Sequence, residues 1–79
     1  DHHAARLDEL VEAVATLAAA SGAPVSAADV VPVLFRRELD LQQRFFAMGE
    51  AIAHLNHLWR TRRLDRRAGA DGAIRFAPA

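Results

Sequence analysis

Hydrophobic residues recur at helical spacing over the first quarter of the chain. They fall three and four positions apart, at Leu7, Leu10, Val11, Val14, Leu17 and Ala18. This spacing predicts a helix over residues 4–20 that buries one stripe of side chains. Gly22 and Pro24 follow it. Because glycine readily adopts the left-handed backbone and proline disfavours helical geometry in the residue before it, we expect the helix to end there.

A capping pattern predicts a second, shorter helix. Ser26 and Asp29 have the spacing of a capping box, in which each side chain accepts a free backbone N–H of the first turn. The helix should therefore begin near Ala27. Pro32 falls inside it and lacks the N–H that an interior helical residue donates, so we expect a kink or a later start.

The longest predicted element is a third helix, from Leu41 to about Arg62. Asp40 and Gln43 repeat the capping pattern at its start. Apolar residues then alternate four and three positions apart, at Leu41, Phe45, Met48, Ile52, Leu55 and Trp59. We expect these six to form the buried face of the helix. The opposite face then points outward, with Glu50 at its centre and Gln43, Ala47 and His54 around it.

Residues 63–77 predict a β-hairpin. Asp71 and Gly72 supply the backbone freedom that its turn requires, and Ile74 and Phe76 share one face of the second strand. Since a lone hairpin is marginally stable, we expect both to pack onto the helices, with Val25 as a short third strand. The predicted fold is α+β and mostly helical: a winged helix, with three helices and a C-terminal β-hairpin wing.

The composition indicates a single small domain without covalent reinforcement. The chain has 79 residues, 52% of them hydrophobic, and no cysteine, so neither disulfides nor thiolate zinc sites support the core. We interpret residues 1–24 as an N-terminal linking helix of the same domain and residues 25–79 as the winged-helix domain. No apolar run approaches the ~20 residues that span a bilayer, which predicts a cytoplasmic protein. Because the chain begins with Asp1, we expect it to be part of a longer polypeptide.

Charge is balanced overall but unevenly distributed. Residues 1–40 carry seven acidic side chains and three arginines, whereas residues 60–79 carry six arginines and two acidic side chains. A basic group is predicted at Arg60, Arg62, Arg63, Arg66 and Arg67. These arginines are candidate contacts for the phosphates of a nucleic acid. The alternative is a solvated helix end, where cations are favoured and where Arg66 and Arg67 pair with acids of the first helix.

The predicted outward face of the third helix favours a protein partner. DNA-binding winged helices usually present arginine, lysine, serine or asparagine to the bases at this face, whereas the Glu50 carboxylate would repel phosphate. Phe46 lies well away from the predicted buried stripe, and an exposed aromatic often marks a protein contact, unless the first helix covers it. We predict a docking surface of Phe46, Glu50 and His54 with part of the first helix.

No catalytic, cofactor-binding or metal-binding residue is predicted. The chain lacks a nucleophile elbow, a glycine-rich phosphate loop, paired carboxylates and a Ser-His-Asp set. Glu50, His54 and His57 share a helix face, but their order is not that of a zinc protease motif and no fourth ligand is evident, so a polar face is favoured over a metal site. His2 and His3 have no spaced partner and are interpreted as a tail.

Several motifs also resemble a known family. They are Leu34 and Phe35, Gln42 and Gln43, the run from Glu50 to Leu55 with Leu58, and Arg75 and Phe76 in the hairpin. Over residues 25–77 the chain resembles the C-terminal winged-helix domain of a branch of metallo-β-lactamase-fold hydrolases. The preceding sequence HHAARLDEL is similar to the helix that leaves their catalytic domain.

The resemblance implies an accessory domain that packs against the catalytic domain of the same polypeptide and shapes substrate access. It implies paired metals, usually zinc, in an H-x-H-x-D-H site on that domain. This motif is absent from the 79 residues, so no ligand role carries over, and His54 would be a helix residue near the domain boundary. Substrates of the superfamily range from thioesters and lactones to RNA. Since Ala-His-Leu before a basic wing also recurs in bacterial regulators, a DNA-binding regulator domain is the alternative, and RNA guidance by the same arginines is a mixed case.

Overall fold

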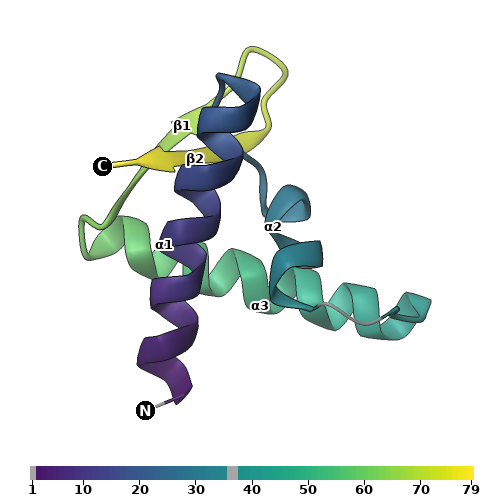
Figure 1. Ribbon diagram of the computed structural model, residues 1–79. Helices are drawn as coiled ribbons and strands as arrows, with labels where there is room; N and C mark the ends of the chain where they lie inside the picture. The colour runs from purple at the N-terminus through teal and green to yellow at the C-terminus, as the bar shows by residue number, and fades with distance from the viewer. Residues whose placement is uncertain (1, 36–37) are drawn as a thin grey trace.

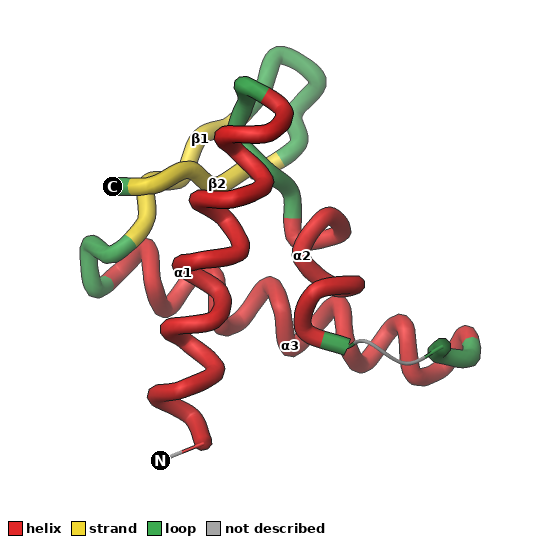
Figure 2. The backbone as a smooth tube through the Cα atoms, viewed as in Figure 1, coloured by secondary structure: helices red, strands yellow, loops and turns green. Residues whose placement is uncertain are grey.

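Three helices and one antiparallel hairpin form the domain. The computed structural model describes residues 2–35 and 38–79, with side chains described from residue 4 on. The elements are α1 His2–Ser21, α2 Ala27–Leu34, α3 Leu41–Arg60, β1 Leu64–Ala68 and β2 Ile74–Pro78. α1 crosses α3, the hairpin lies beside the C-terminal half of α1, and the N-terminal end of α3 projects past α2 (Figures 1 and 2). The α+β, mostly helical prediction is confirmed.

The predicted capping residues set the starts of α2 and α3. Asp29 donates its N–H to Ser26 Oγ at 3.3 Å, and its carboxylate accepts the Ser26 N–H at 3.0 Å. Asp40 and Gln43 exchange the same pair of bonds at 2.8 and 3.0 Å. Each box satisfies two donors that a helix start leaves free. α2 begins at Ala27 as predicted and continues through Pro32, so of the two expected effects of Pro32, a kink or a late start, the late start does not occur.

The exit from α1 and the hairpin turn use glycine as predicted. Gly22 has a φ of 71° and donates its N–H to the Ala18 carbonyl at 2.8 Å. Gly72 has a φ of 82° in the turn between β1 and β2. A left-handed backbone is strained for most other residues, so these two positions depend on glycine.

The hairpin is joined to the helical part by a third extended segment. β1 and β2 pair antiparallel, from Leu64 opposite Pro78 to Ala68 opposite Ile74. Val25, between α1 and α2, pairs with Phe76 through two backbone hydrogen bonds of 2.7 and 2.8 Å. The predicted role of Val25 as a short third strand is confirmed as a single bridge.

One core holds side chains from every element. Its buried members are Leu7, Leu10, Val14, Val25, Val30, Ala51, Leu55, Leu58, Leu64 and Phe76. The predicted stripe of α1 lies on this core, with three members buried and three partly buried against it. Phe76 packs inward as predicted, but Ile74 is 44% exposed, so its expected burial is wrong.

The buried face of α3 differs from the prediction. Its buried residues are Ala47, Ala51, Leu55 and Leu58. Of the six predicted, Leu55 is fully buried and Met48 and Trp59 are partly buried, whereas Leu41, Phe45 and Ile52 are exposed by 71, 73 and 45%. Ala47, expected on the outward side, is 1% exposed. At 100° per residue the helix is rotated by roughly a quarter turn from the prediction.

Two features of the fold account for this rotation. α2 has only 8 residues and α3 has 20, so α2 cannot cover the N-terminal turns that carry Leu41 and Phe45. Alanine at positions 47 and 51 lets neighbouring elements approach the axis of α3 closely, which larger side chains would prevent. The small residues therefore face the core, and the large ones remain outside.

The rotation of α3 predicts opposite responses at neighbouring positions. Replacing Leu55 with alanine should lower the free energy of unfolding by about 2–5 kcal/mol, because it leaves a cavity in the core. Replacing Ile52 with alanine should cost less than about 1 kcal/mol, because its side chain is half exposed. Urea denaturation of the two variants measures both values. Equal losses would contradict the observed rotation.

Candidate docking surface

The three predicted docking residues lie along one side of α3, with graded exposure. Phe46 is 69% exposed, so α1 does not cover it, and the predicted exposure of this aromatic ring is confirmed. The Glu50 side chain is 43% exposed and that of His54 is 14% exposed. The expectation that Glu50 centres an open polar face is therefore wrong: this side of α3 runs from an exposed ring, through a half-exposed carboxylate, to a largely covered imidazole.

The imidazole of His54 is held by the preceding turn of its own helix. Its Nδ1 lies 2.6 Å from the Glu50 carbonyl oxygen and 3.6 Å from a Glu50 carboxylate oxygen. Because a carbonyl only accepts hydrogen bonds, Nδ1 must carry the proton. These contacts with Glu50 fix the orientation of the His54 ring.

The described side chains form no metal site. Among residues 4–35 and 38–79, no group of three or more histidine, aspartate or glutamate side chains lies close enough to hold an ion. Nδ1 of His54 is directed at a backbone carbonyl, and His57 is exposed near the end of α3. His2 and His3 lie outside the described side chains. None of the helices in the described part is long and apolar enough to cross a membrane.

The predicted arginine group is divided among separate partners. Arg63 pairs with Asp8 of α1 at 2.8 Å. Arg66 donates a 2.7 Å hydrogen bond to the Asn56 side chain, and its guanidinium stacks on the Trp59 ring at 3.6 Å from the centroid. Arg67 lies 3.8 Å from Asp65 of the same strand. The expectation that Arg66 and Arg67 pair with acids of α1 is therefore wrong, and Arg63 makes that contact.

Arg60 and Arg62 are the two members of the group whose side chains pair with none of the described residues. Both lie at the end of α3. Arg62 has a φ of 65°, and the Arg63 N–H bonds back to the Leu58 carbonyl at 2.8 Å. This is the Schellman arrangement, which usually places glycine at the left-handed position. An arginine there strains the backbone, so the turn between α3 and β1 carries a local energetic cost.

The tip of the hairpin holds a further ion pair. Arg75 donates two hydrogen bonds to the Asp71 carboxylate, at 3.0 and 3.1 Å, and the Ala73 N–H donates a third at 3.1 Å. These bonds favour the charged carboxylate, and the contact with Arg75 is the largest cause that lowers the pKa of Asp71 to about 2. The pair closes the turn that Gly72 permits.

A second apolar side of α3 was missed in the sequence. It consists of Phe45, Gly49, Ile52 and Ala53, all of them exposed, with Phe46 at its border, and is called the Gly49 face below. The positions are i, i+4, i+7 and i+8, which share one side of a helix. That spacing was the available signal. It was hidden because Phe45 and Ile52 also belong to the six-residue stripe that was expected to be buried.

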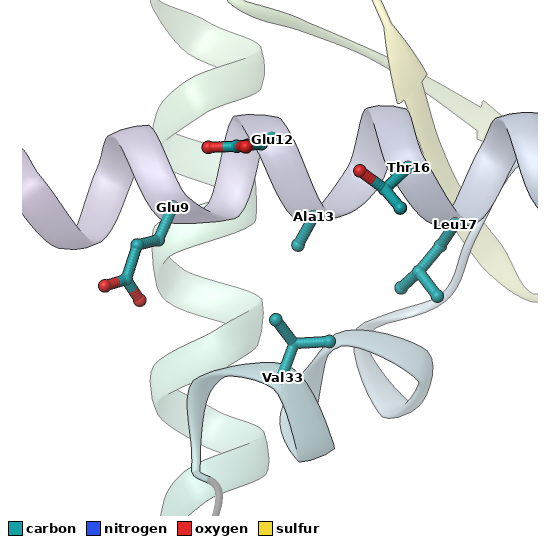
Figure 3. Close-up of a pocket in the computed structure, with 6 residues that line it drawn as sticks. All are labelled: Glu9, Glu12, Ala13, Thr16, Leu17 and Val33. Atoms are coloured by element: carbon teal, nitrogen blue, oxygen red, sulfur yellow. The ribbon is translucent and has the colours of Figure 1, made fainter.

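The hollows beside the helices include one next to α1 and one next to α3. One, between α1 and α2, has a volume of 270 Å³, with Ala13, Leu17 and Val33 pointing into it and Glu9 at its rim (Figure 3). The other, of 340 Å³, lies between α3 and the hairpin and includes the half-exposed Ile52. Both are mostly apolar and open, and neither brings together the groups that nucleophilic or acid–base catalysis requires.

Comparison with known proteins identifies the family. The family model described as the metallo-beta-lactamase-like C-terminal domain matches residues 7–79. The chain belongs to this family. A solved structure described as a beta-lactamase domain protein from Burkholderia ambifaria is 52% identical, with a TM-score of 0.81. No curated protein matches the chain significantly.

This metallo-β-lactamase-like C-terminal domain is short compared with that neighbour. The match covers 99% of the chain but only 22% of the Burkholderia ambifaria protein. The resemblance to a C-terminal domain of metallo-β-lactamase-like proteins, predicted from Leu34, Phe35, the Glu50 to Leu55 run and the hairpin, is thus confirmed. The family match does not identify individual site residues. The structure alone locates them: Phe46, Glu50 and His54 lie on one side of α3, and the five arginines are dispersed.

The lowered pKa of Asp71 predicts a contribution to stability that depends on pH. The carboxyl has an ordinary pKa of 3.8 in the unfolded chain and about 2 in the fold. Its contribution is therefore complete above about pH 4 and is lost as the pH falls toward 2. Thermal denaturation between pH 2 and 6 should show a smaller acid loss for Asp71→Asn than for the unmodified domain. Identical pH profiles would contradict this pairing.

The left-handed backbone at Arg62 predicts that glycine stabilises this position. Arg62→Gly should raise the free energy of unfolding by about 1 kcal/mol, because it removes the steric cost of a side chain at positive φ. Arg60→Gly is the matched control in the last turn of α3, where it should cost up to about 1 kcal/mol. Urea denaturation of both variants checks the opposite signs. A loss at both positions would contradict the strained turn.

Proposed function

We propose that this domain is the non-catalytic accessory module of a metallo-β-lactamase-like, metal-dependent hydrolase. In this role it packs against the catalytic domain of the same polypeptide and shapes the access of substrate to it. The observation that carries the proposal is the exposed ring of Phe46 on α3, beside the half-exposed Glu50 carboxylate. Large exposed apolar groups rimmed by polar ones are typical of protein contacts.

The order of elements supports a winged-helix module. α1 is followed by the extended residue Val25, then by α2, α3 and the two strands of the hairpin. This order, with the short extended segment paired to the last strand, corresponds to a three-helix unit with a hairpin wing. In this interpretation α3 is the helix that a DNA-binding relative would place in the major groove.

The surface of α3 supports a protein partner over DNA. The exposed side chains of its N-terminal half include Leu41, Phe45 and Phe46, which offer no hydrogen bond to DNA, while Gln43 and Arg44 beside them are hydrogen-bonded to Asp40 and to the Leu39 carbonyl. Of the arginines nearby, Arg63 and Arg66 are already paired within the domain. The proposed function therefore does not include binding of a nucleic acid. A DNA-binding regulator domain is the alternative function.

Metal chemistry belongs to the catalytic domain in this proposal. The described part of this chain has no group of ligands for zinc, and His54 is directed at a backbone carbonyl. The residues present therefore do not fit a metal centre, and no step of a reaction is assigned to them. Their role is to bind and position the neighbouring domain.

Substitution at Phe46 tests the docking role in a polypeptide that contains both domains. Phe46→Ser should accelerate proteolytic cleavage at the junction before α1 by about tenfold, because burial of an aromatic anchor commonly contributes more than 1 kcal/mol to an interface. The melting temperature of the 79-residue chain should stay nearly unchanged, since Phe46 is outside the core. Time courses of limited proteolysis and thermal denaturation measure the two effects.

Phe45→Ser is the matched control, because it removes an equally exposed ring that points to another side of α3. It should leave cleavage unchanged at concentrations where the protein is monomeric. Equal acceleration by both variants would move the docking surface to the Gly49 face, and no acceleration by either would refute the docking role. Tight, salt-sensitive binding of duplex DNA by the two-domain protein would favour the alternative function.

A further inference from the structure

The Gly49 face is an apolar surface that the proposed docking of the catalytic domain leaves unexplained. Phe45 is 73% exposed and Ile52 is 45% exposed, and Gly49 and Ala53 lie between and beside them. Phe46 borders this face and the docking surface. None of these residues carries a formal charge, so the face has no electrostatic barrier to contact with an identical surface.

Gly49 itself has no role inside the domain. A Cβ added at this position would meet no atom within 4 Å. Glycine is also a poor residue for the middle of a helix, because it gains nothing from packing and loses the most backbone freedom. No contact among the described residues requires this glycine. Because it has no side chain, it leaves room beside the exposed aromatic residues for the backbone of another helix to approach.

The residues of the face are spaced symmetrically about Gly49, and this spacing favours a second copy of the same helix as the partner. Counting outward from Gly49, Phe45 and Ala53 are four positions away, and Phe46 and Ile52 are three positions away. In an antiparallel pair of α3 helices related by a two-fold axis at Gly49, Phe45 of one copy faces Ala53 of the other. A large side chain is then level with a small one, and Phe45 lies beside Ile52 of the second copy, because both are on the same side of the Gly49 line.

We propose that the Gly49 face binds a second copy of this chain, with the two α3 helices antiparallel across a two-fold axis at Gly49. This pairing goes beyond the docking of the catalytic domain and does not depend on it. Gln42 and Asn56, each seven positions from Gly49, are level with each other at the two ends of the apolar region, where the Asn56 amide is already hydrogen-bonded to Arg66 and to the Ile52 carbonyl.

Charge distribution selects the antiparallel direction. α3 is preceded by Glu38 and Asp40 and followed by Arg60 and Arg62, all exposed. An antiparallel pair places the acidic start of each helix beside the basic end of the other, whereas a parallel pair places like charges together. The side chains of Arg60 and Arg62 pair with none of the described residues of their own chain, so they remain available for this contact.

The size of the face predicts a weak, reversible dimer. One helix face offers less than the roughly 800 Å² per partner of a standard stable interface. We therefore expect dissociation constants in the micromolar range. Sedimentation velocity of the 79-residue chain, which has its own buried core, should show a shift from monomer to dimer as the concentration rises from about 1 to 500 µM.

Gly49→Leu separates dimer formation from folding. The substitution should raise the melting temperature, because leucine favours the helix and meets no atom of the domain. It should weaken dimer formation at least tenfold, because its side chain fills the space needed by the second helix. Ala15→Leu, at an exposed position of α1, is the control and should leave the dimer unchanged. A dimer insensitive to Gly49→Leu, or a monomer at every concentration, would overturn the proposal.

A cross-link tests the position of the two-fold axis. Because the chain has no cysteine, Gly49→Cys introduces a single thiol that meets its own copy at the axis, within the Cα separation of about 4.4–6.8 Å that a disulfide spans. Mild oxidation should convert it to a covalent dimer faster than the exposed control Ala15→Cys. Equal rates would overturn the proposal.

The same cross-link identifies a competing occupant. In a polypeptide that contains both domains, Gly49→Cys should still form the covalent dimer. If the cross-link forms in the 79-residue chain but is lost in the longer protein, the catalytic domain covers the Gly49 face and the second-copy proposal is overturned. Because the docking role is tested by cleavage of Phe46→Ser, the two proposals can fail independently.

Discussion

The packing of the alanine and leucine side of α3 against the rest of the domain determines which surfaces remain open. Ala51, Leu55 and Leu58 are fully buried, and the core they enter also contains Leu10 and Val14 of α1. A helix in close contact on this side has a fixed rotation about its axis. The exposure of Phe45 and Phe46 is a direct consequence of that rotation.

Local features of the fold were predictable because their causes are local. The caps at Ser26 and Asp40, the exit at Gly22 and the turn at Gly72 each depend on residues within a few positions. The stripe of α1 was predictable because its large apolar residues all face one side. The rotation of α3 was not, because both of its sides carry apolar residues, and only tertiary contacts decide between Ala51 and Ile52.

The arginine group shows a second limit of sequence interpretation. Nearness in sequence suggested one basic surface, but each arginine is directed by the element that carries it. Arg63 meets Asp8, which is 55 positions away, and Arg66 is turned back onto Trp59 of α3. Neither contact could be predicted from the pattern of charges along the chain. Among the residues that the structure describes, only the exposed Arg63–Asp8 pair joins the acidic and basic ends of the sequence, and an exposed pair contributes little to stability.

α3 thus has a buried side, a side bearing Phe46 and Glu50, and the Gly49 face. Burying an exposed phenylalanine is favourable by about 25 cal/mol for each Å² of apolar area removed from water. The isolated domain does not gain this free energy at Phe45 and Phe46, because both rings remain exposed. The two rings point in directions roughly 100° apart on the helix, so one flat partner surface cannot cover both equally. In the two proposals, the catalytic domain covers Phe46 and a second copy of the chain covers Phe45. Gly49, which no contact within the described part of the domain requires, favours the side of Phe45 for the approach of another helix.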